Sequence, residues 1–170
     1  MTHDLTLILG GARSGKSAFA EAEVTSHPGP WHYMATAQAF DDEMRERIAQ
    51  HRRDRADGWV THEVPLGLTG ALHDVPAAVP VLVDCLTLWL TNQILAETDL
   101  HTEIAALERA LRARRGPVWL VANEVGLGIV PENTLARRFR DEAGRLNQRI
   151  GQIATRVRFI AAGLPLALKG

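Results

Sequence analysis

The chain has 170 residues, of which 46% are hydrophobic and 23% charged, with a formal net charge of -1 and a pI near 6.7. This length predicts a single globular domain, residues 1–170, and the balanced charge argues against a nucleic-acid or anionic-membrane partner. The single cysteine, Cys85, excludes an internal disulfide and favours a reducing, cytoplasmic location. The first residues lack the pattern of a signal peptide, and no uncharged apolar segment reaches the roughly 18 residues of a membrane span.

The first predicted elements are a strand, a glycine-rich loop and a helix. The apolar run Leu5–Leu9 predicts a buried strand, and Gly10-x-x-x-x-Gly15-Lys16-Ser17 then matches the phosphate-binding loop pattern. Good helix formers follow over residues 18–23. In such a loop, backbone N–H groups and the positive end of the helix face an anion. Lys16 would reach the outer phosphates and the Ser17 hydroxyl would hold Mg²⁺, so the sequence predicts binding of a nucleoside triphosphate.

A second strand, a helix and a third strand are expected between residues 31 and 64. Apolar residues predict strands at 31–35 and 59–64. The intervening helix opens with the acidic Asp41–Glu43 and closes with the basic Arg52–Arg53, as the helix dipole prefers. A weaker helix pattern covers residues 66–73.

Strands and helices continue to alternate to the end of the chain. Helices are expected at 86–97, 103–115 and 135–153, and strands at 79–83, 118–122 and 157–161, with an edge strand at 166–168. This alternation predicts an α/β fold in the manner of P-loop NTPases, a three-layer sandwich around a mostly parallel sheet. The C-terminal edge strand is a candidate for antiparallel pairing.

Polar residues that end the predicted strands are site candidates together, because ligands of parallel sheets gather at the carboxyl ends of the strands. They are Gly10, Thr36, Glu63, Asp84, Asn123 and Glu124. Asp84 directly follows an apolar run and is expected to hold Mg²⁺, the alternative being an N-cap for the next helix. The loop that starts at Asn123–Glu124 and contains two glycines is either a substrate loop or a simple connection.

His51 is the candidate nucleophile. Its spacing alone, however, favours a structural role over a catalytic one. It lies seven residues after Met44 and three after Ile48, which places it near the same face of the predicted helix. Neutral imidazole is a competent nucleophile at phosphorus, and the arginines at 52, 53 and 55 would neutralise a triphosphate.

Motifs spread over nearly the whole chain resemble the bifunctional adenosylcobinamide kinase / adenosylcobinamide-phosphate guanylyltransferase family. The most specific is Asn123-Glu124-Val125-Gly126-x-Gly128-Ile129-Val130-Pro131-Glu132. The other matching blocks are Gly10–Ser17, Tyr33–Gln38, Asp41–Met44, Arg47-Ile48-x-x-His51, Val83–Thr87, Thr91–Asn92, Ala136–Asp141, Gly144–Gln148 and Ala162–Pro165.

The resemblance implies two reactions in cobalamin biosynthesis. Adenosylcobinamide takes a phosphoryl group from ATP or GTP, and GTP then transfers GMP to the product through a covalent GMP-histidine, giving adenosylcobinamide-GDP and pyrophosphate. His51 matches that histidine, with Lys16 as the second catalytic residue, Ser17 and Asp84 as Mg²⁺ ligands, and a homotrimer as the assembly. The implied nucleotide contacts are Gly10, Gly11, Ala12, Arg13, Ser14, Gly15, Lys16, Ser17, Thr36, Ala37, Gln38, Arg52, Arg53, Asp54, Arg55, Glu63 and Asp84.

Two rival functions differ in the fate of the nucleotide. One is a P-loop small-molecule kinase without guanylyltransferase activity, in which His51 is a bystander. The other is a GTP-dependent switch protein, which the sequence disfavours because it lacks the Asn-Lys-x-Asp guanine-recognition motif.

Overall fold

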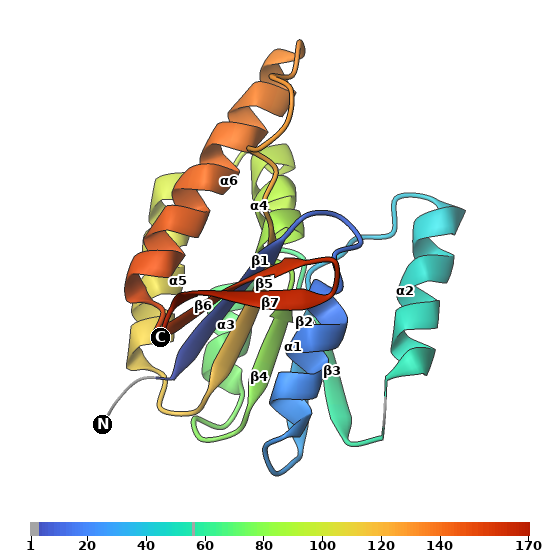
Figure 1. Cartoon of the computed structure of the whole chain (residues 1–170), viewed down its shortest axis with the longest axis vertical. Coiled ribbons are helices and arrows are strands. Elements are labelled where there is room, and N and C mark those ends of the chain that lie inside the picture. Colours follow the sequence, from blue (N-terminus) through green and yellow to red (C-terminus); the bar gives the residue numbers. More distant parts are fainter. Residues whose placement is uncertain (1–3, 56) are drawn as a thin grey trace.

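The computed structural model describes residues 4–55 and 57–170, and for Arg47, His51 and Asp54 it describes the backbone alone. The described residues form a seven-stranded sheet in the order β3-β2-β4-β5-β1-β6-β7 (Figure 1). Every pairing among β1 to β6 is parallel, whereas β7 runs antiparallel to β6 at one edge. The strands are β1 (Leu5–Gly10), β2 (Trp31–Ala35), β3 (Trp59–Glu63), β4 (Val81–Asp84), β5 (Val118–Asn123), β6 (Arg156–Ala161) and β7 (Leu164–Lys169).

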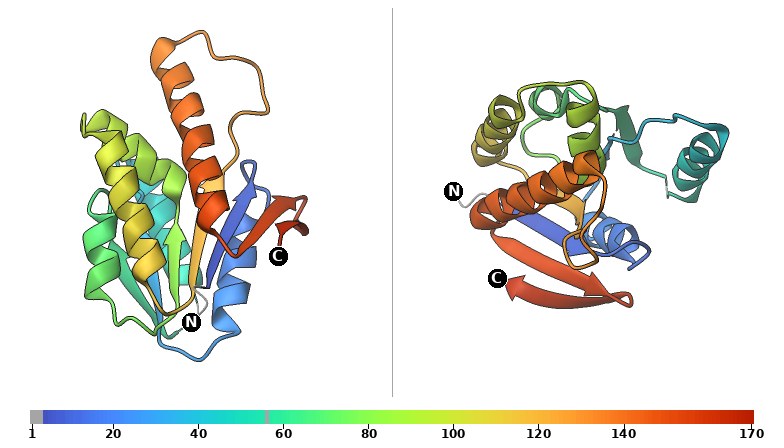
Figure 2. Two further views of the ribbon diagram at one scale, coloured as in Figure 1. Left: turned by 90° about the vertical axis from the view of Figure 1, so that its left-hand side faces the viewer. Right: turned by 90° about the horizontal axis from the view of Figure 1, so that it is seen from above.

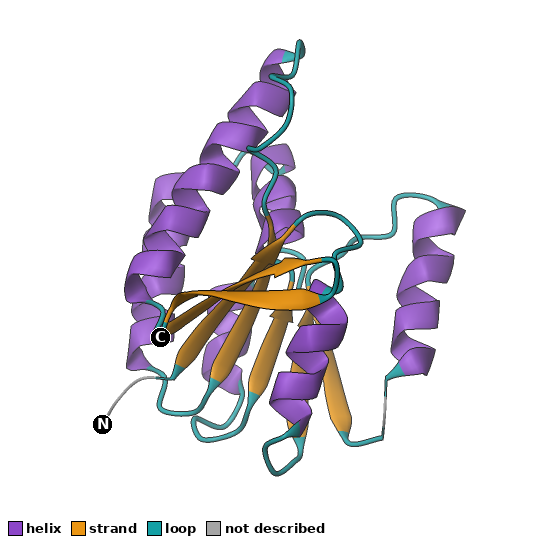
Figure 3. Cartoon of the chain, in the orientation of Figure 1, coloured by secondary structure: helices purple, strands orange, loops and turns teal. Residues whose placement is uncertain are grey.

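Helices connect the parallel strands and cover both faces of the sheet, which confirms the predicted fold class (Figure 3). They are α1 (Lys16–Thr25), α2 (Asp42–Asp54), α3 (Leu68–Asp74), α4 (Leu86–Leu95), α5 (Leu100–Ala113) and α6 (Thr134–Ile153). Across the described residues, no helix has both the length and the apolar character that a membrane crossing requires.

Two apolar clusters fill the space between sheet and helices. Leu5 and Leu7 of β1 are buried in the larger cluster, beneath α3, α4, α5 and α6. Ile8 points to the opposite face and is buried with Ala20 and Val24 of α1. This alternation along β1 follows from the two-residue period of a strand, and burial on both faces explains why β1 reads as a continuous apolar run.

Helix α2 stands apart from the layered body, beyond the β3 side of the sheet (Figure 2). Asp41 caps its start, because the Asp41 carboxylate accepts a hydrogen bond from the backbone N–H of Met44 at 2.7 Å. Met44 and Ile48 are half-buried, so α2 keeps an apolar face although it lies outside the main core.

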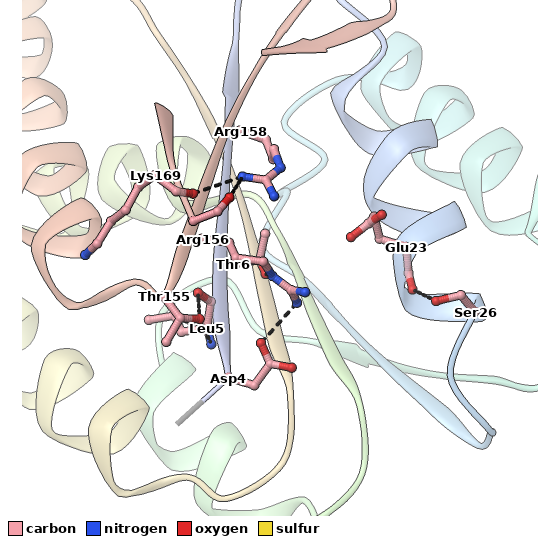
Figure 4. A network of polar contacts seen from close by, with 10 residues as sticks. Asp4, Leu5, Thr6, Glu23, Ser26, Thr155, Arg156, Arg158 and Lys169 are labelled. Atoms are coloured by element: carbon pink, nitrogen blue, oxygen red, sulfur yellow. Dashed lines mark hydrogen bonds and ion pairs between the residues drawn. The ribbon is translucent and has the colours of Figure 1, made fainter. Parts of the chain in front are cut away.

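The amino end of β1 is joined to β6 by a polar network (Figure 4). The Thr155 hydroxyl donates to the carbonyl oxygen of Leu5 at 2.9 Å and accepts from the Leu5 N–H at 3.1 Å. The Arg156 guanidinium donates to Thr6 Oγ1 and to Asp4 Oδ1, both at 3.0 Å. These contacts fix the register of β1, and with it the position of the loop that follows.

Candidate active site

The phosphate-binding loop, residues 10–17, runs from the end of β1 into α1. Gly15, the N-cap of α1, has φ of 95°, a conformation that residues with a Cβ rarely adopt. The C-terminal hairpin supports the loop from outside, because the Gly163 N–H donates to the carbonyl oxygen of Ser14 at 2.8 Å. The loop is therefore held by its own backbone conformation and by the turn between β6 and β7.

Lys16 extends back along this loop. Its ammonium group donates to the carbonyl oxygen of Gly11 at 2.6 Å, and the residue is only 8% exposed. Burial lowers the pKa of Lys16 from its ordinary value, and the neighbouring Asp84 opposes that shift. An ammonium group held at a glycine-rich loop before a helix N-terminus is suited to bind a polyphosphate.

Asp84 ends β4, which β5 separates from β1. Its carboxylate is held from two sides. Asp84 Oδ2 accepts hydrogen bonds from Ser17 Oγ at 2.8 Å and from the Tyr33 hydroxyl at 2.9 Å. The N-cap of α4 is Cys85, whose Sγ accepts from the Leu88 N–H, so Asp84 does not have the capping role that the sequence left open. A carboxylate beside a hydroxyl supplies the hard oxygen ligands that Mg²⁺ prefers.

Tyr33 was not among the residues predicted for the site. It is buried, and burial followed by the nearby Asp84 raises the pKa of its hydroxyl far above the ordinary value. The Arg55 guanidinium lies over the Tyr33 ring, 3.7 Å from its centroid, and Trp59 meets the ring edge-on at 5.7 Å. Tyr33 therefore remains a neutral hydrogen-bond donor and connects three strands with the end of α2.

These residues surround a pocket of about 330 Å³ at the carboxyl ends of the strands. Five of the predicted nucleotide contacts line it, together with Asn123 and two residues of α2. The lining includes Lys16, Ser17, Tyr33, Ala37, Arg55, Asp84, Asn123, Met44 and Ile48. In the described part of the chain, no three histidine, cysteine or carboxylate side chains gather as a metal site. A cation here would therefore need oxygen atoms from a bound phosphate in addition to those of the protein.

His51 belongs to the C-terminal half of α2. Its backbone lies three positions after Ile48 and seven after Met44, and both of those residues line the pocket. In an α-helix this spacing places a residue on the same face. The side chains of His51 and Asp54 lie outside the described residues, so their roles stay predictions.

Other predicted contacts lie away from the pocket or at its margin. Thr36 is fully buried, and its hydroxyl bonds both the N–H and the carbonyl oxygen of Cys85. Arg52 and Glu63 are exposed and form an ion pair at 3.3 Å. Glu63 lines a separate hollow between β3 and α3, and Arg53 is exposed on α2.

The loop after β5 begins at the pocket and then runs over the surface. The backbone N–H of Asn123 donates to Thr87 Oγ1 at 2.7 Å, which fixes the start of the loop. Glu124 Oε1 accepts from the Gly126 N–H at 2.7 Å, and further along Ile129 is 97% exposed. Exposed apolar residues in a loop beside a pocket are typical of a surface that contacts another molecule.

Comparisons with known proteins assign the family. The family model described as cobinamide kinase / cobinamide phosphate guanyltransferase matches residues 6–168. The bifunctional adenosylcobalamin biosynthesis protein CobP of Pseudomonas aeruginosa is 50% identical over 167 residues, which are 96% of each chain. The bifunctional adenosylcobalamin biosynthesis protein CobU of Salmonella typhimurium is 41% identical, with 97% of this chain and 99% of that one covered.

Solved structures with low sequence identity share the fold alone. The flagellar accessory protein FlaH from Methanocaldococcus jannaschii aligns with a TM-score of 0.55 and 14% identity, covering 98% of this chain and 78% of that one. A second solved structure, an ATPase domain, aligns with a TM-score of 0.51 and 13% identity, covering 92% of this chain and 69% of that one.

Proposed function

The chain belongs to the cobinamide kinase / cobinamide phosphate guanyltransferase family, and from that premise we propose how one pocket serves both reactions. The protein is a transferase of cobalamin biosynthesis that phosphorylates adenosylcobinamide and transfers GMP from GTP to the resulting phosphate. The observation that supports a shared pocket is the set of residues that line it. Lys16 and Ser17 at the start of α1, Asp84 at the end of β4, and Met44 and Ile48 of α2 line the same space of about 330 Å³.

In the kinase step, the loop residues hold the triphosphate. Backbone N–H groups of residues 10–17 and the Lys16 ammonium bind the β- and γ-phosphates. Ser17 and Asp84 would hold Mg²⁺, which neutralises charge on the phosphates. The hydroxyl oxygen of adenosylcobinamide forms a bond to the γ-phosphorus and gives up its proton to solvent, as the bond from that phosphorus to the β-phosphate oxygen breaks. The nucleoside diphosphate leaves.

In the guanylyltransferase step, we assign the nucleophile to His51. A ring nitrogen forms a bond to the α-phosphorus of GTP, and pyrophosphate leaves. A phosphate oxygen of adenosylcobinamide phosphate then attacks the same phosphorus and releases the imidazole. Arg55 lines the pocket one turn after His51, and we assign it the binding of the phosphates during both displacements.

The remaining assignments belong to the same proposal. Ala37 lines the pocket, whereas Thr36, Gln38, Arg52, Arg53 and Glu63 lie outside its lining, so their contacts with the nucleotide are proposed from the family resemblance alone. A single domain over residues 1–170, a homotrimeric assembly and a cytoplasmic location are proposed with them.

Replacing His51 by alanine separates the two reactions. We expect His51→Ala to lose GMP transfer and protein labelling by α-³²P-GTP, while phosphoryl transfer to adenosylcobinamide continues. His101→Ala removes an exposed imidazole on α5, outside the pocket lining, and should behave as wild type in both assays. GMP transfer at the wild-type rate by His51→Ala would place the covalent step elsewhere. Wild-type protein that phosphorylates adenosylcobinamide but releases no pyrophosphate from GTP would indicate a kinase alone.

A further inference from the structure

We propose that Tyr33 is a positioning residue that fixes both the Asp84 carboxylate and the last turn of α2 relative to the nucleotide pocket. The Tyr33 hydroxyl fixes the Asp84 carboxylate, and the Tyr33 ring fixes the last turn of α2. This inference depends on the proposed roles of Asp84 and His51, and it adds a residue that the motifs leave without a function.

The hydroxyl of Tyr33 sets the orientation of Asp84. Tyr33 and Ser17 both donate to Oδ2 of Asp84, from β2 and α1, so the carboxylate is held at that oxygen from two directions. No donor among the described residues is assigned to Oδ1. Hydrogen bonds to a carboxylate are stronger and more directional than those between neutral groups. The two donors therefore keep Oδ2 occupied and leave Oδ1 for a cation bound in the pocket that Asp84 lines.

Burial makes the Tyr33 hydroxyl difficult to replace. Tyr33 is 5% exposed, packs against Trp59 and the apolar cluster under α1, and lines the pocket together with Asp84, so its ring fixes the hydroxyl at the pocket wall. A buried tyrosine usually finds some partner for its hydroxyl. Here that partner is the carboxylate at the end of β4 rather than a backbone carbonyl, which joins the packing of β2 to the proposed metal ligand.

The ring of Tyr33 holds the end of α2. Arg55 is the C-cap of α2, and its guanidinium stacks over the ring at 3.7 Å from the centroid. Arg55 also donates to Thr61 Oγ1 on β3 at 3.3 Å. Because α2 stands apart from the main core, such contacts at its C-terminal end have a large share in fixing its position. His51 lies one helical turn before Arg55, so the ring contact sets the position from which the imidazole acts.

Tyr33→Phe tests the hydroxyl without removing the ring. Binding of Mn²⁺ to the protein in the presence of a non-hydrolysable GTP analogue is followed by the electron paramagnetic resonance signal of free Mn²⁺. We expect the apparent dissociation constant for Mn²⁺ to rise about tenfold, the usual effect of losing one hydrogen bond to a charged group. Thr25→Val removes a hydroxyl at the far end of α1 that donates to the carbonyl oxygen of Glu21, and should leave the constant unchanged.

Tyr33→Leu tests the ring. We expect labelling by α-³²P-GTP to be at least tenfold slower in Tyr33→Leu than in Tyr33→Phe, because only leucine removes the stacking surface for Arg55. If Tyr33→Leu does not fold, Tyr33→Met examines the same contact, since methionine fills the core position without an aromatic ring.

The outcomes distinguish this inference from the proposed function. Wild-type protein that binds no Mn²⁺ with the nucleotide, or takes no label at His51, would contradict the proposed function itself. If wild type does both, Mn²⁺ binding within twofold of wild type in Tyr33→Phe overturns the role of the hydroxyl. Equal labelling rates in Tyr33→Leu and Tyr33→Phe overturn the role of the ring.

Discussion

Gly10, the first glycine of the phosphate-binding loop, has no room for a side chain. A Cβ at this position would lie 2.6 Å from the carbonyl oxygen of Ile160 and 2.6 Å from Ser14 Oγ. Ordinary van der Waals contact begins at 3.4 Å, so each contact would be about 0.8 Å too short. Gly10 and Ile160 are paired in the parallel register of β1 and β6, and the Ile160 carbonyl cannot retreat without loosening the sheet. The loop would have to move instead.

We therefore expect Gly10→Ala to lower the free energy of unfolding by about 1–3 kcal/mol, the usual cost of overpacking. The kcat of both transfers should fall about a hundredfold, because a displacement near 1 Å at the reacting groups has that effect. Gly11→Ala is the matched control, since no heavy atom of the described residues lies within 4 Å of its Cβ. Urea unfolding and steady-state kinetics measure the two effects. If Gly10→Ala and Gly11→Ala have the same free energy of unfolding and the same kcat, the crowding argument is refuted.

Three further changes have distinct readouts. Asp84→Asn should weaken Mg²⁺ binding and lower kcat by about a hundredfold with the fold intact, and near-normal Mg²⁺ dependence would argue against a metal ligand at this position. Arg114→Leu should lower the free energy of unfolding by about 3 kcal/mol, because this buried guanidinium donates to four backbone carbonyls in α3 and in the segment that joins it to β4. Urea unfolding measures the loss, and an unchanged midpoint would contradict it. Burial, then the charges of His62 and Arg114, lower the pKa of His32 below its ordinary 6.5. The unfolded chain then binds more protons at this site than the folded protein as the pH falls below about 6.5, so the stability of the wild type should decrease there. Between about pH 7 and pH 5, the Tm of His32→Asn should fall less than the Tm of the wild type. An equal fall in both proteins would contradict this reasoning.

Much of the fold could be predicted because its signals are local. The apolar run of β1, the glycine spacing of the loop and the helix formers of α1 are contiguous, and all three elements lie where they were expected. The C-terminal edge strand is also confirmed, as β7 pairs antiparallel with β6. Boundaries were less accurate. The helix expected from residue 103 begins at Leu100, because Asp99 accepts hydrogen bonds from the first backbone N–H groups of α5.

The contacts within the site could be predicted only in part. Tyr33 and Asp84 are 51 positions apart, and a tyrosine in an apolar strand reads as a core residue. The only indication in the sequence that Tyr33 belongs to the site is its hydroxyl, a polar group in an apolar strand. Thr36 illustrates the opposite case, since a polar residue at a strand end looked available for ligands but is bonded to the backbone of Cys85. Which polar groups turn inward depends on pairings between strands that no local pattern contains.

A covalent GMP on His51 is the feature on which the proposed two-step transfer depends. Protein incubated with GTP and Mg²⁺, without a corrinoid, is digested and its peptides are measured by mass spectrometry. We predict that the peptide containing His51 gains the mass of one GMP residue, and that adenosylcobinamide phosphate removes it. An unmodified His51 peptide, in protein that transfers GMP under the same conditions, would contradict the proposed intermediate.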